Sequence, residues 1–229
     1  MTKVSAGSYD LNKWLYGGYE RDVITTIYGG PGSGKTNFCL LAAVSHAKKG
    51  ERVLYVDTEG GFSIERVKQL AGEDYERVLD GIVVLKPTNF QEQKDAFKEL
   101  LIHVKNNHLG LIVVDGMTML YRLEFADARK KDLSEMQDVN HELVKQMRTL
   151  AEIARKQGIP VIVTNQVYNW EKNTKMVGGD ILQYWSKCLI ELVNEGGKRA
   201  AFLRKHRSLP EKKLDFVIVN EGVKKRGWL

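Results

Sequence analysis

ITTIYGGPGSGKTNF, residues 24–38, places four glycines, a proline, a lysine and a threonine between two apolar segments. Residues 29–36 fit the pattern G-x-x-x-x-G-K-[ST], with a strand-like run before them and a helix-like run after them, as a phosphate-binding loop requires. Backbone N–H groups that no side chain obstructs can surround a phosphate at a helix N-terminus, where the helix dipole favours an anion. A simple glycine turn would not need Lys-Thr at this point. We therefore expect a nucleoside triphosphate to contact these residues: Gly29, Gly30, Pro31, Gly32, Ser33, Gly34, Lys35, Thr36 and Asn37.

Two residues of this loop offer more than backbone contacts. Lys35 can bridge the β- and γ-phosphates, and Thr36 can offer its hydroxyl to Mg²⁺. Asp115 closes LGLIVVDG (residues 109–116), the most apolar strand-like run of the chain, and should emerge beside the phosphates at the carboxyl edge of a sheet. The sequence therefore predicts ATP and Mg²⁺ as ligands, with Thr36 and Asp115 at the metal.

The alternation of strand-like and helix-like segments predicts the fold class. The β-branched runs are short and almost entirely apolar, as strands buried on both faces of a parallel sheet are; they cover residues 23–29, 52–59, 81–87, 109–116 and 160–167. Helix-like stretches separate them, at residues 35–48, 63–71, 91–107 and 131–157. This order predicts an α/β fold with a mainly parallel central sheet flanked by helices. Gly196-Gly197 between two later strand-like runs predicts a hairpin, and hence C-terminal antiparallel strands.

Length and composition limit the class of protein. With 229 residues, 43% of them hydrophobic and 28% charged, the chain is expected to form one globular domain, residues 1–229. We expect no membrane partner, because no run of about 18 apolar residues occurs. The first ten residues lack the apolar core of a secretory signal, and Cys39 and Cys188 have no metal-ligand spacing. A cytoplasmic, reduced protein is the expectation.

The excess positive charge is concentrated near the C-terminus. The net charge of +6 comes from 35 basic and 29 acidic residues. Residues 198–229 contain ten Lys or Arg against three Asp or Glu, a net of +7, so residues 1–197 carry −1. A local basic patch of this kind suits a polyanion such as nucleic acid, and a solvated terminus is the alternative.

Polar side chains follow two further strand-like runs. Glu59 comes just after one of them and precedes two glycines, where a carboxylate can orient or deprotonate an attacking water. A surface acid in a turn is the alternative. Gln166 ends another run, at the edge where α/β sheets bind ligands, and can sense a γ-phosphate. Amide side chains also end strands as turn formers, so both interpretations of Gln166 stand.

Taken together, these segments resemble the ATPase core of the RecA/RadA recombinase family, and most closely its short archaeal members that consist of that core. The matching stretches are SAGSYDLNKWLYGGYERDVITTIYG, the phosphate loop, YVDTEGGFSIERV, LIVVDGMTMLYR, IPVIVTNQV and KHRSLPE. The resemblance implies a RecA-like fold in which Lys35, Glu59 and Gln166 act in catalysis, with Glu59 activating water. It further implies that Asp115 is associated with Mg²⁺, that Gln166 couples the γ-phosphate to a DNA-binding loop, and that Arg66 lies over the adenine.

The chain also departs from the usual pattern of that family. Only 28 residues precede the phosphate loop, which leaves no room for an N-terminal DNA-binding domain or the F-x-x-A motif used in polymerisation. Residues 125–128, FADA, have that spelling but fall in a predicted charged loop, and the segment after Gln166 is short for a DNA-gripping loop. These departures predict an accessory role in homologous recombination.

The predicted accessory binds ATP and single-stranded DNA and modulates the main RadA-type recombinase, with weak or no ATP hydrolysis. Other recombination proteins and a second copy of the chain, in a homodimer, are further candidate partners. Two alternatives stay open: an oligomeric motor ATPase of the ring-helicase or clock-protein type, and a non-enzymatic adapter.

Three basic segments could contact DNA: residues 121–133, residues 167–176 and the C-terminal patch. Aromatic rings in such segments can stack on bases while Lys and Arg meet phosphates. The named candidates are Arg204, Lys205, His206, Arg207, Trp170 and Lys172. Lys205 and Arg207, two apart on a strand, would point the same way and could instead reach a γ-phosphate bound by a neighbouring subunit.

Overall fold

A computed structural model describes residues 3–106, 109–170 and 173–227. Its strands are β1 (Lys3–Val4), β2 (Tyr19–Glu20), β3 (Ile24–Gly29), β4 (Arg52–Asp57), β5 (Ile82–Leu85), β6 (Leu109–Asp115), β7 (Val161–Trp170), β8 (Asn173–Met176), β9 (Cys188–Glu195), β10 (Lys198–Lys205), β11 (Lys212–Val219) and β12 (Gly222–Lys225). Its helices are α1 (Tyr9–Trp14), α2 (Lys35–Ala47), α3 (Ile64–Ala71), α4 (Tyr75–Asp80), α5 (Phe90–Asn106), α6 (Met119–Ala128), α7 (Leu133–Gln157) and α8 (Gly179–Trp185), with a 3₁₀ turn at Gly72–Asp74.

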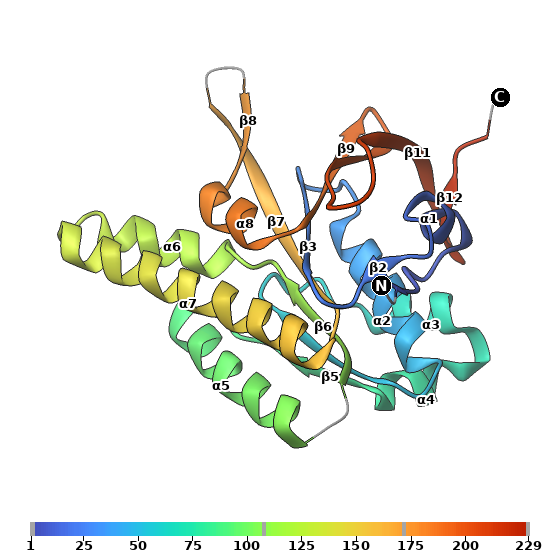
Figure 1. Cartoon of the computed structure of the whole chain (residues 1–229), viewed down its shortest axis with the longest axis horizontal. Helices are drawn as coiled ribbons and strands as arrows, with labels where there is room; N and C mark the ends of the chain where they lie inside the picture. Colours follow the sequence, from blue (N-terminus) through green and yellow to red (C-terminus); the bar gives the residue numbers. More distant parts are fainter. Residues whose placement is uncertain (1–2, 107–108, 171–172, 228–229) are drawn as a thin grey trace.

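A ten-stranded sheet runs through the molecule in the order β12-β11-β10-β9-β3-β7-β6-β4-β5, with β8 paired to β7 (Figure 1). Strands β9, β3, β7, β6, β4 and β5 are parallel to one another, and β10, β11 and β12 continue the sheet from β9 with antiparallel pairing. The predicted fold class, a mainly parallel central sheet with C-terminal antiparallel strands, is therefore confirmed.

Helices cover both faces of the parallel strands, with α2, α3 and α4 on one side and α5, α6 and α7 on the other (Figure 1). Successive side chains of a strand point to opposite faces, and β4 shows the result. Val53 and Tyr55 belong to the core under α2, whereas Leu54 and Val56 belong to the core under α5 and α7. Burial on both faces explains why the strand-like runs are almost continuously apolar.

The carboxyl ends of four neighbouring strands meet at one edge of the sheet. Gly29 at the end of β3 pairs with Gln166 on β7, and Asp57 at the end of β4 pairs with Asp115 at the end of β6. Thr58 ties two of these ends together, because its N–H donates to the Asp115 carbonyl at 2.8 Å. The polar residues expected at strand ends are thus brought to one place.

The C-terminal strands form the predicted hairpin. Gly196 (φ 56°) and Gly197 (φ 84°) join β9 to β10, and both adopt the left-handed region that a two-residue hairpin turn needs. At the end of the sheet, α1 covers the outer edge of β12. The Ser8 hydroxyl donates to the Val223 carbonyl at 2.6 Å, and the Lys225 N–H donates to Asp10 at 2.7 Å.

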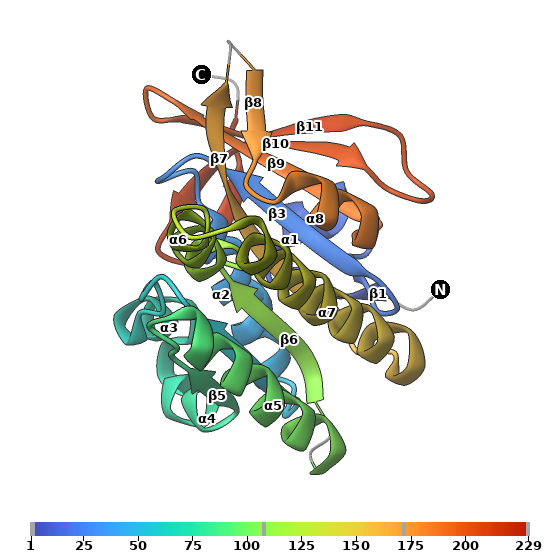
Figure 2. The same cartoon turned by 90° about the vertical axis from the view of Figure 1, so that its left-hand side faces the viewer.

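Two segments differ from the expectations. The predicted charged loop that contains residues 125–128 is helix α6, because Leu120, Tyr121 and Ala128 form a buried face against α7. The short segment after Gln166 forms a two-stranded ribbon in place of a loop: β7 continues to Trp170 and pairs with β8, and this ribbon rises out of the molecule (Figures 1 and 2). No helix in the described ranges combines the length and the apolarity needed to cross a membrane.

Candidate nucleotide-binding site

The phosphate loop connects β3 to α2, as predicted. Gly34 (φ 110°) is the N-cap residue, a conformation that favours glycine, and α2 begins at Lys35. Lys35 is 8% exposed, and its ammonium donates to the carbonyls of Gly29 (2.9 Å) and Gly30 (3.0 Å). Burial lowers the pKa of Lys35, while the negative charges of Glu59 and Asp115 act in the opposite direction. The lysine thus sits at the mouth of the loop, near both carboxylates.

Two glycines of the loop also pack closely against the C-terminal strands. A Cβ at Gly29 would lie 2.1 Å from the carbonyl oxygen of Leu192, and one at Gly34 would lie 3.2 Å from Cδ1 of Ile218. Strands β9 and β11 therefore form a wall of the site that the sequence did not predict. A cavity of about 280 Å³ lies between the loop and β9. The Ser33 hydroxyl is buried and has no hydrogen-bond partner in the described part of the chain, which suits a ligand oxygen there.

Thr36 and Asp115 both lie close to Gly61. A Cβ at Gly61 would lie 3.3 Å from Oγ1 of Thr36 and 3.9 Å from Oδ2 of Asp115, so the two oxygens face the same small space. Asp115 is 2% exposed and accepts hydrogen bonds from Tyr55 (2.7 Å) and Thr164 (2.5 Å), which hold its carboxylate in place. Oxygen ligands at the end of a phosphate loop fit Mg²⁺, which takes one or two protein groups besides phosphate oxygens and water.

Glu59 is held by the residue expected to sense the γ-phosphate. The Gln166 amide Nε2 donates to Oε2 of Glu59 at 3.0 Å. Gly116 lies against the same carboxylate, since a Cβ there would be 2.4 Å from Oε1 of Glu59. Asp57, which had no predicted role, shapes the turn before this site: its carboxylate accepts from the N–H groups of residues 61 and 62, each at 3.0 Å.

Arg66 joins three segments that are far apart in the sequence. Its Nε donates to Oδ1 of Asn37 at 2.9 Å, and its Nη groups donate to the carbonyls of Val219 (2.8 Å) and Asn220 (3.1 Å) in the β11–β12 turn. Desolvation lowers the pKa of Arg66. The structure therefore places Arg66 and Asn37 at the side of the nucleotide site, with the guanidinium donors bound to protein groups.

The four basic candidates at the end of β10 are bound by other parts of the chain. Arg204 pairs with Glu191 at 2.7 Å, and the Lys205 ammonium donates to the carbonyl of Gln183 at 2.8 Å. The expectation that Lys205 and Arg207 share one face of a strand is wrong, because β10 ends at Lys205.

The last two members of this patch surround a buried acid. Arg207 pairs with Asp22 at 2.8 Å and with Glu20 at 3.0 Å, and His206 lies 3.7 Å from the same Glu20. Burial lowers the pKa of His206, and the Asp22 and Glu20 carboxylates raise that of Arg207. Most of the positive charge of residues 204–207 is therefore compensated by carboxylates of the same chain.

The β7–β8 ribbon borders a second cavity, of about 620 Å³, between β3, α6 and α8. Tyr28, Tyr121, Tyr168 and Lys175 are among its lining residues, and Tyr168 is 40% exposed. Burial raises the pKa of Tyr28 to about 12. The side chain of Trp170 and the whole of Lys172 lie outside the described residues.

A family model described as Rad51 matches residues 1–226. The DNA repair and recombination protein RadB of Methanobrevibacter smithii is 43% identical over 223 residues, which cover 93% of this chain and 92% of that protein. The chain belongs to the RadB proteins of the Rad51 family. RadB of Methanocaldococcus jannaschii is 40% identical over 213 residues (93% of this chain, 98% of that protein). A solved structure described as the crystal structure of the RadB recombinase is 33% identical, with a TM-score of 0.79, and covers 97% of this chain and 99% of that one.

Membership of the RadB proteins confirms the resemblance and the RecA-like fold expected from DTEG, TNQV and the phosphate loop. It places the chain among DNA repair and recombination proteins, in a fold family of ATPases that use a nucleotide and Mg²⁺.

Proposed function

We propose that this RadB protein is an ATP-controlled accessory of homologous recombination that binds single-stranded DNA and modulates a RadA-type recombinase. ATP contacts residues 29–37, and Thr36 and Asp115 hold its Mg²⁺, which neutralises phosphate charge when bound. In this proposal, nucleotide binding sets the position of a DNA-binding ribbon, and hydrolysis contributes little.

The observation that carries this proposal is the 3.0 Å hydrogen bond from Gln166 to Glu59. Glu59 belongs to the nucleotide site, whereas Gln166 belongs to β7, the strand that continues into the β7–β8 ribbon. A γ-phosphate that competes for either side chain would change this bond. The ribbon would then move with it, because it is the direct continuation of the same strand.

The cavity beside the ribbon has the chemistry of a single-strand binding surface. Tyr168 offers an exposed ring and Lys175 an exposed ammonium. Bases of any sequence can stack on an aromatic ring, and a nearby cation can meet the phosphates. These two described residues replace the patch at residues 204–207 as the best candidates for DNA contact.

Slow hydrolysis follows from the groups within the site. Lys35 and Glu59 can position the γ-phosphate and a water molecule, but charge develops on the phosphoryl oxygens in the transition state. An arginine directed at that charge contributes roughly 10³–10⁵ in rate in other phosphoryl-transfer systems. Lys205 and Arg207, the pair on which the motor-type alternative depends, are bound by the Gln183 carbonyl and by the Glu20 and Asp22 carboxylates of their own chain, which counts against that alternative.

The test is the affinity for a fluorescein-labelled 30-nucleotide oligo-dT, measured by fluorescence anisotropy with ATP, with ADP and without nucleotide. We expect ATP to change the affinity at least threefold, Lys35→Ala to abolish that change, and Tyr168→Ala with Lys175→Ala to weaken binding about tenfold. Lys68→Ala with Tyr75→Ala, a stacked pair on α3 and α4, is the matched control.

Glu59→Gln separates the accessory from the motor-type alternative. The accessory proposal predicts that this variant keeps ATP-dependent DNA binding. The opposite result would be fast, DNA-stimulated ATP turnover in the wild type and loss of both turnover and DNA binding in Glu59→Gln. That result would identify a motor and overturn the proposal.

A further inference from the structure

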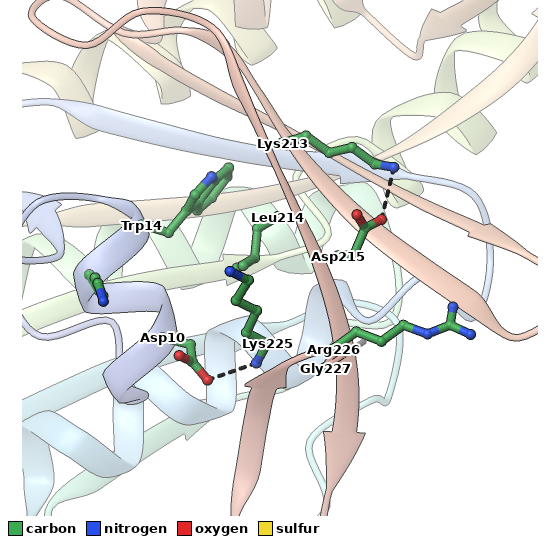
Figure 3. Close-up of a pocket in the computed structure, with 9 residues that line it drawn as sticks. Asp10, Trp14, Lys213, Leu214, Asp215, Lys225, Arg226 and Gly227 are labelled. Atoms are coloured by element: carbon green, nitrogen blue, oxygen red, sulfur yellow. Dashed lines mark hydrogen bonds and ion pairs between the residues drawn. The ribbon is translucent and has the colours of Figure 1, made fainter. Parts of the chain in front are cut away.

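Basic residues of α1, β11 and the end of β12 line a cavity far from the β7–β8 ribbon. This cavity, of about 650 Å³, is bordered by α1, β11 and β12 (Figure 3). Its basic lining residues are Lys13, Lys213, Lys225 and Arg226, and its acidic ones are Asp10 and Asp215. The lining thus carries four positive charges against two negative ones.

Both acids of the cavity are already engaged. Asp215 pairs with the Lys213 ammonium at 2.8 Å, and Asp10 accepts from the backbone N–H of Lys225 at 2.7 Å (Figure 3). By contrast, the side chains of Lys13, Lys225 and Arg226 make no hydrogen bond or ion pair with any residue that the structure describes. Figure 3 shows the Arg226 side chain extending away from Lys225 and Asp10, so Lys13 and Lys225 are the two lining cations that this side of the cavity leaves without a counter-charge.

A further lysine next to this cavity is held out of water. The Lys212 ammonium lies 4.1 Å from the centre of the Tyr16 ring and 6.0 Å from that of Trp14, and it is buried with no hydrogen-bond partner among the described residues. Desolvation lowers its pKa. Its positive charge adds to the field of the cavity, where a low-dielectric wall strengthens attraction for an anion.

Exposed aromatic rings at both ends of α1 indicate which anion suits this surface. Tyr9 begins the helix and Tyr16 follows its end, and the two residues are 78% and 71% exposed. Lys13 lies between them in the sequence, and the Tyr16 ring lies beside the Lys212 ammonium. Rings interleaved with free cations are the pattern of single-strand recognition, in which bases stack and phosphates meet ammonium groups. An acidic peptide would use the cations but would leave the rings without a role.

We propose that the cavity between α1, β11 and β12 is a second single-stranded nucleic-acid site, separate from the β7–β8 ribbon. The inference rests on the proposed DNA-binding function and adds a second contact for the same strand. Strand β11 also forms a wall of the nucleotide site, through Ile218 beside Gly34, so the two ligands approach the same strand.

Salt dependence of oligo-dT binding tests the site, because each phosphate contact contributes about 0.7 to the slope of log affinity against log salt for single strands. Lys13→Gln with Lys225→Gln should weaken binding about three- to tenfold at 0.1 M salt and lower the slope by about 1.4. Lys98→Gln with Lys224→Gln is the matched control: it removes two charges from surface ion pairs outside the cavity. Melting temperatures check that both double variants fold.

A slope equal to that of the control would overturn the inference. A second result would also overturn it: Lys13→Gln with Lys225→Gln loses affinity for a labelled ten-residue poly-glutamate peptide but binds DNA as the wild type does. The cavity would then be a peptide site. The proposed function fails separately: if wild-type protein does not bind oligo-dT, both proposals fall. If Tyr168→Ala with Lys175→Ala has no effect on oligo-dT binding but Lys13→Gln with Lys225→Gln does, the assignment of the ribbon as a DNA contact is wrong and the second site stands.

Discussion

The amide of Gln166 donates a 3.0 Å hydrogen bond to the carboxylate of Glu59, across 107 positions of sequence. Glu59 follows the end of β4, whereas Gln166 lies within β7, and each has a neighbour that limits its movement. The Glu59 carboxylate packs so closely against Gly116 that a side chain at position 116 would collide with it. Gln166 is paired in the sheet with Gly29 of the phosphate loop. A change in nucleotide state at this place therefore has a direct route to β7.

Gln166→Ala should uncouple nucleotide from DNA. Without the amide, the hydrogen bond that links Glu59 to β7 is lost, so the ATP-dependent change in oligo-dT affinity should shrink to less than about 1.5-fold. ATP affinity, measured by calorimetry, should change by less than about threefold, because the phosphate loop is intact. Gln157→Ala, at the exposed end of α7, is the control. An unchanged ATP effect in Gln166→Ala would show that the signal takes another route.

Gly116→Ala should displace the Glu59 carboxylate without removing it. The new methyl group would lie 2.4 Å from Oε1 of Glu59, a distance that real structures do not tolerate. Any ATP turnover, measured by phosphate release over hours, should fall at least tenfold, and ATP binding should persist. Gly227→Ala, where a Cβ would meet nothing within 4 Å, serves as the control. Turnover at the wild-type rate would mean that Glu59 does not position the attacking water.

Arg66→Ala should weaken both the fold and nucleotide binding. It removes hydrogen bonds to Asn37 and to two carbonyls of the β11–β12 turn, and we expect a loss of about 1–2 kcal/mol in the free energy of unfolding. ATP affinity should fall as well, because Asn37 and the turn border the site. Arg77→Ala removes an exposed i,i+3 pair and should cost less than about 0.5 kcal/mol. Urea unfolding with and without ATP separates the two effects.

The His206 region should make stability depend on pH. Burial lowers the pKa of His206, although the carboxylate of Glu20 opposes this; Arg207, Lys3 and Lys212 act with burial. The unfolded chain, with a histidine pKa of about 6.5, therefore takes up the proton first as the pH falls. The free energy of unfolding should be greatest above pH 6.5 and should decrease toward pH 5.

His206→Gln should flatten this pH dependence, measured by urea unfolding at pH 8, 7, 6 and 5. Part of the slope should persist, because burial also lowers the pKa of His46. His141→Gln, on the surface of α7, should leave the slope unchanged. If the free energy of unfolding depends on pH equally in His206→Gln and in the wild type, His206 is not the source of the pH dependence.

The strands and the phosphate loop could be predicted because their signals are local. A strand buried on both faces must be apolar at each position, and a phosphate loop must carry its glycines and Lys-Thr within eight residues. Helix α6 was missed because its buried face consists of only a few residues within a charged segment, and α7 provides the surface that they cover.

The state of the basic residues could not be predicted, because their partners are distant in sequence. Arg207 is bound by Asp22, 185 positions away, and only the fold brings the two together. The same holds for Arg66 and the β11–β12 turn, 153 positions apart. The number of charges in a segment can be read from the sequence, but which of them are paired within the chain is known only from the structure.

The walls of the nucleotide site also set the order in which the protein can mature during synthesis. Residues 29–36 leave the ribosome early, but Gly29 packs on Leu192, Gly34 on Ile218, and Arg66 on the turn that follows β11. Contacts over such long separations form late, because the chain between them must first be ordered. The newborn chain therefore carries its phosphate loop for most of its translation without a complete pocket, and it becomes competent for ATP only when its last strands have joined the sheet.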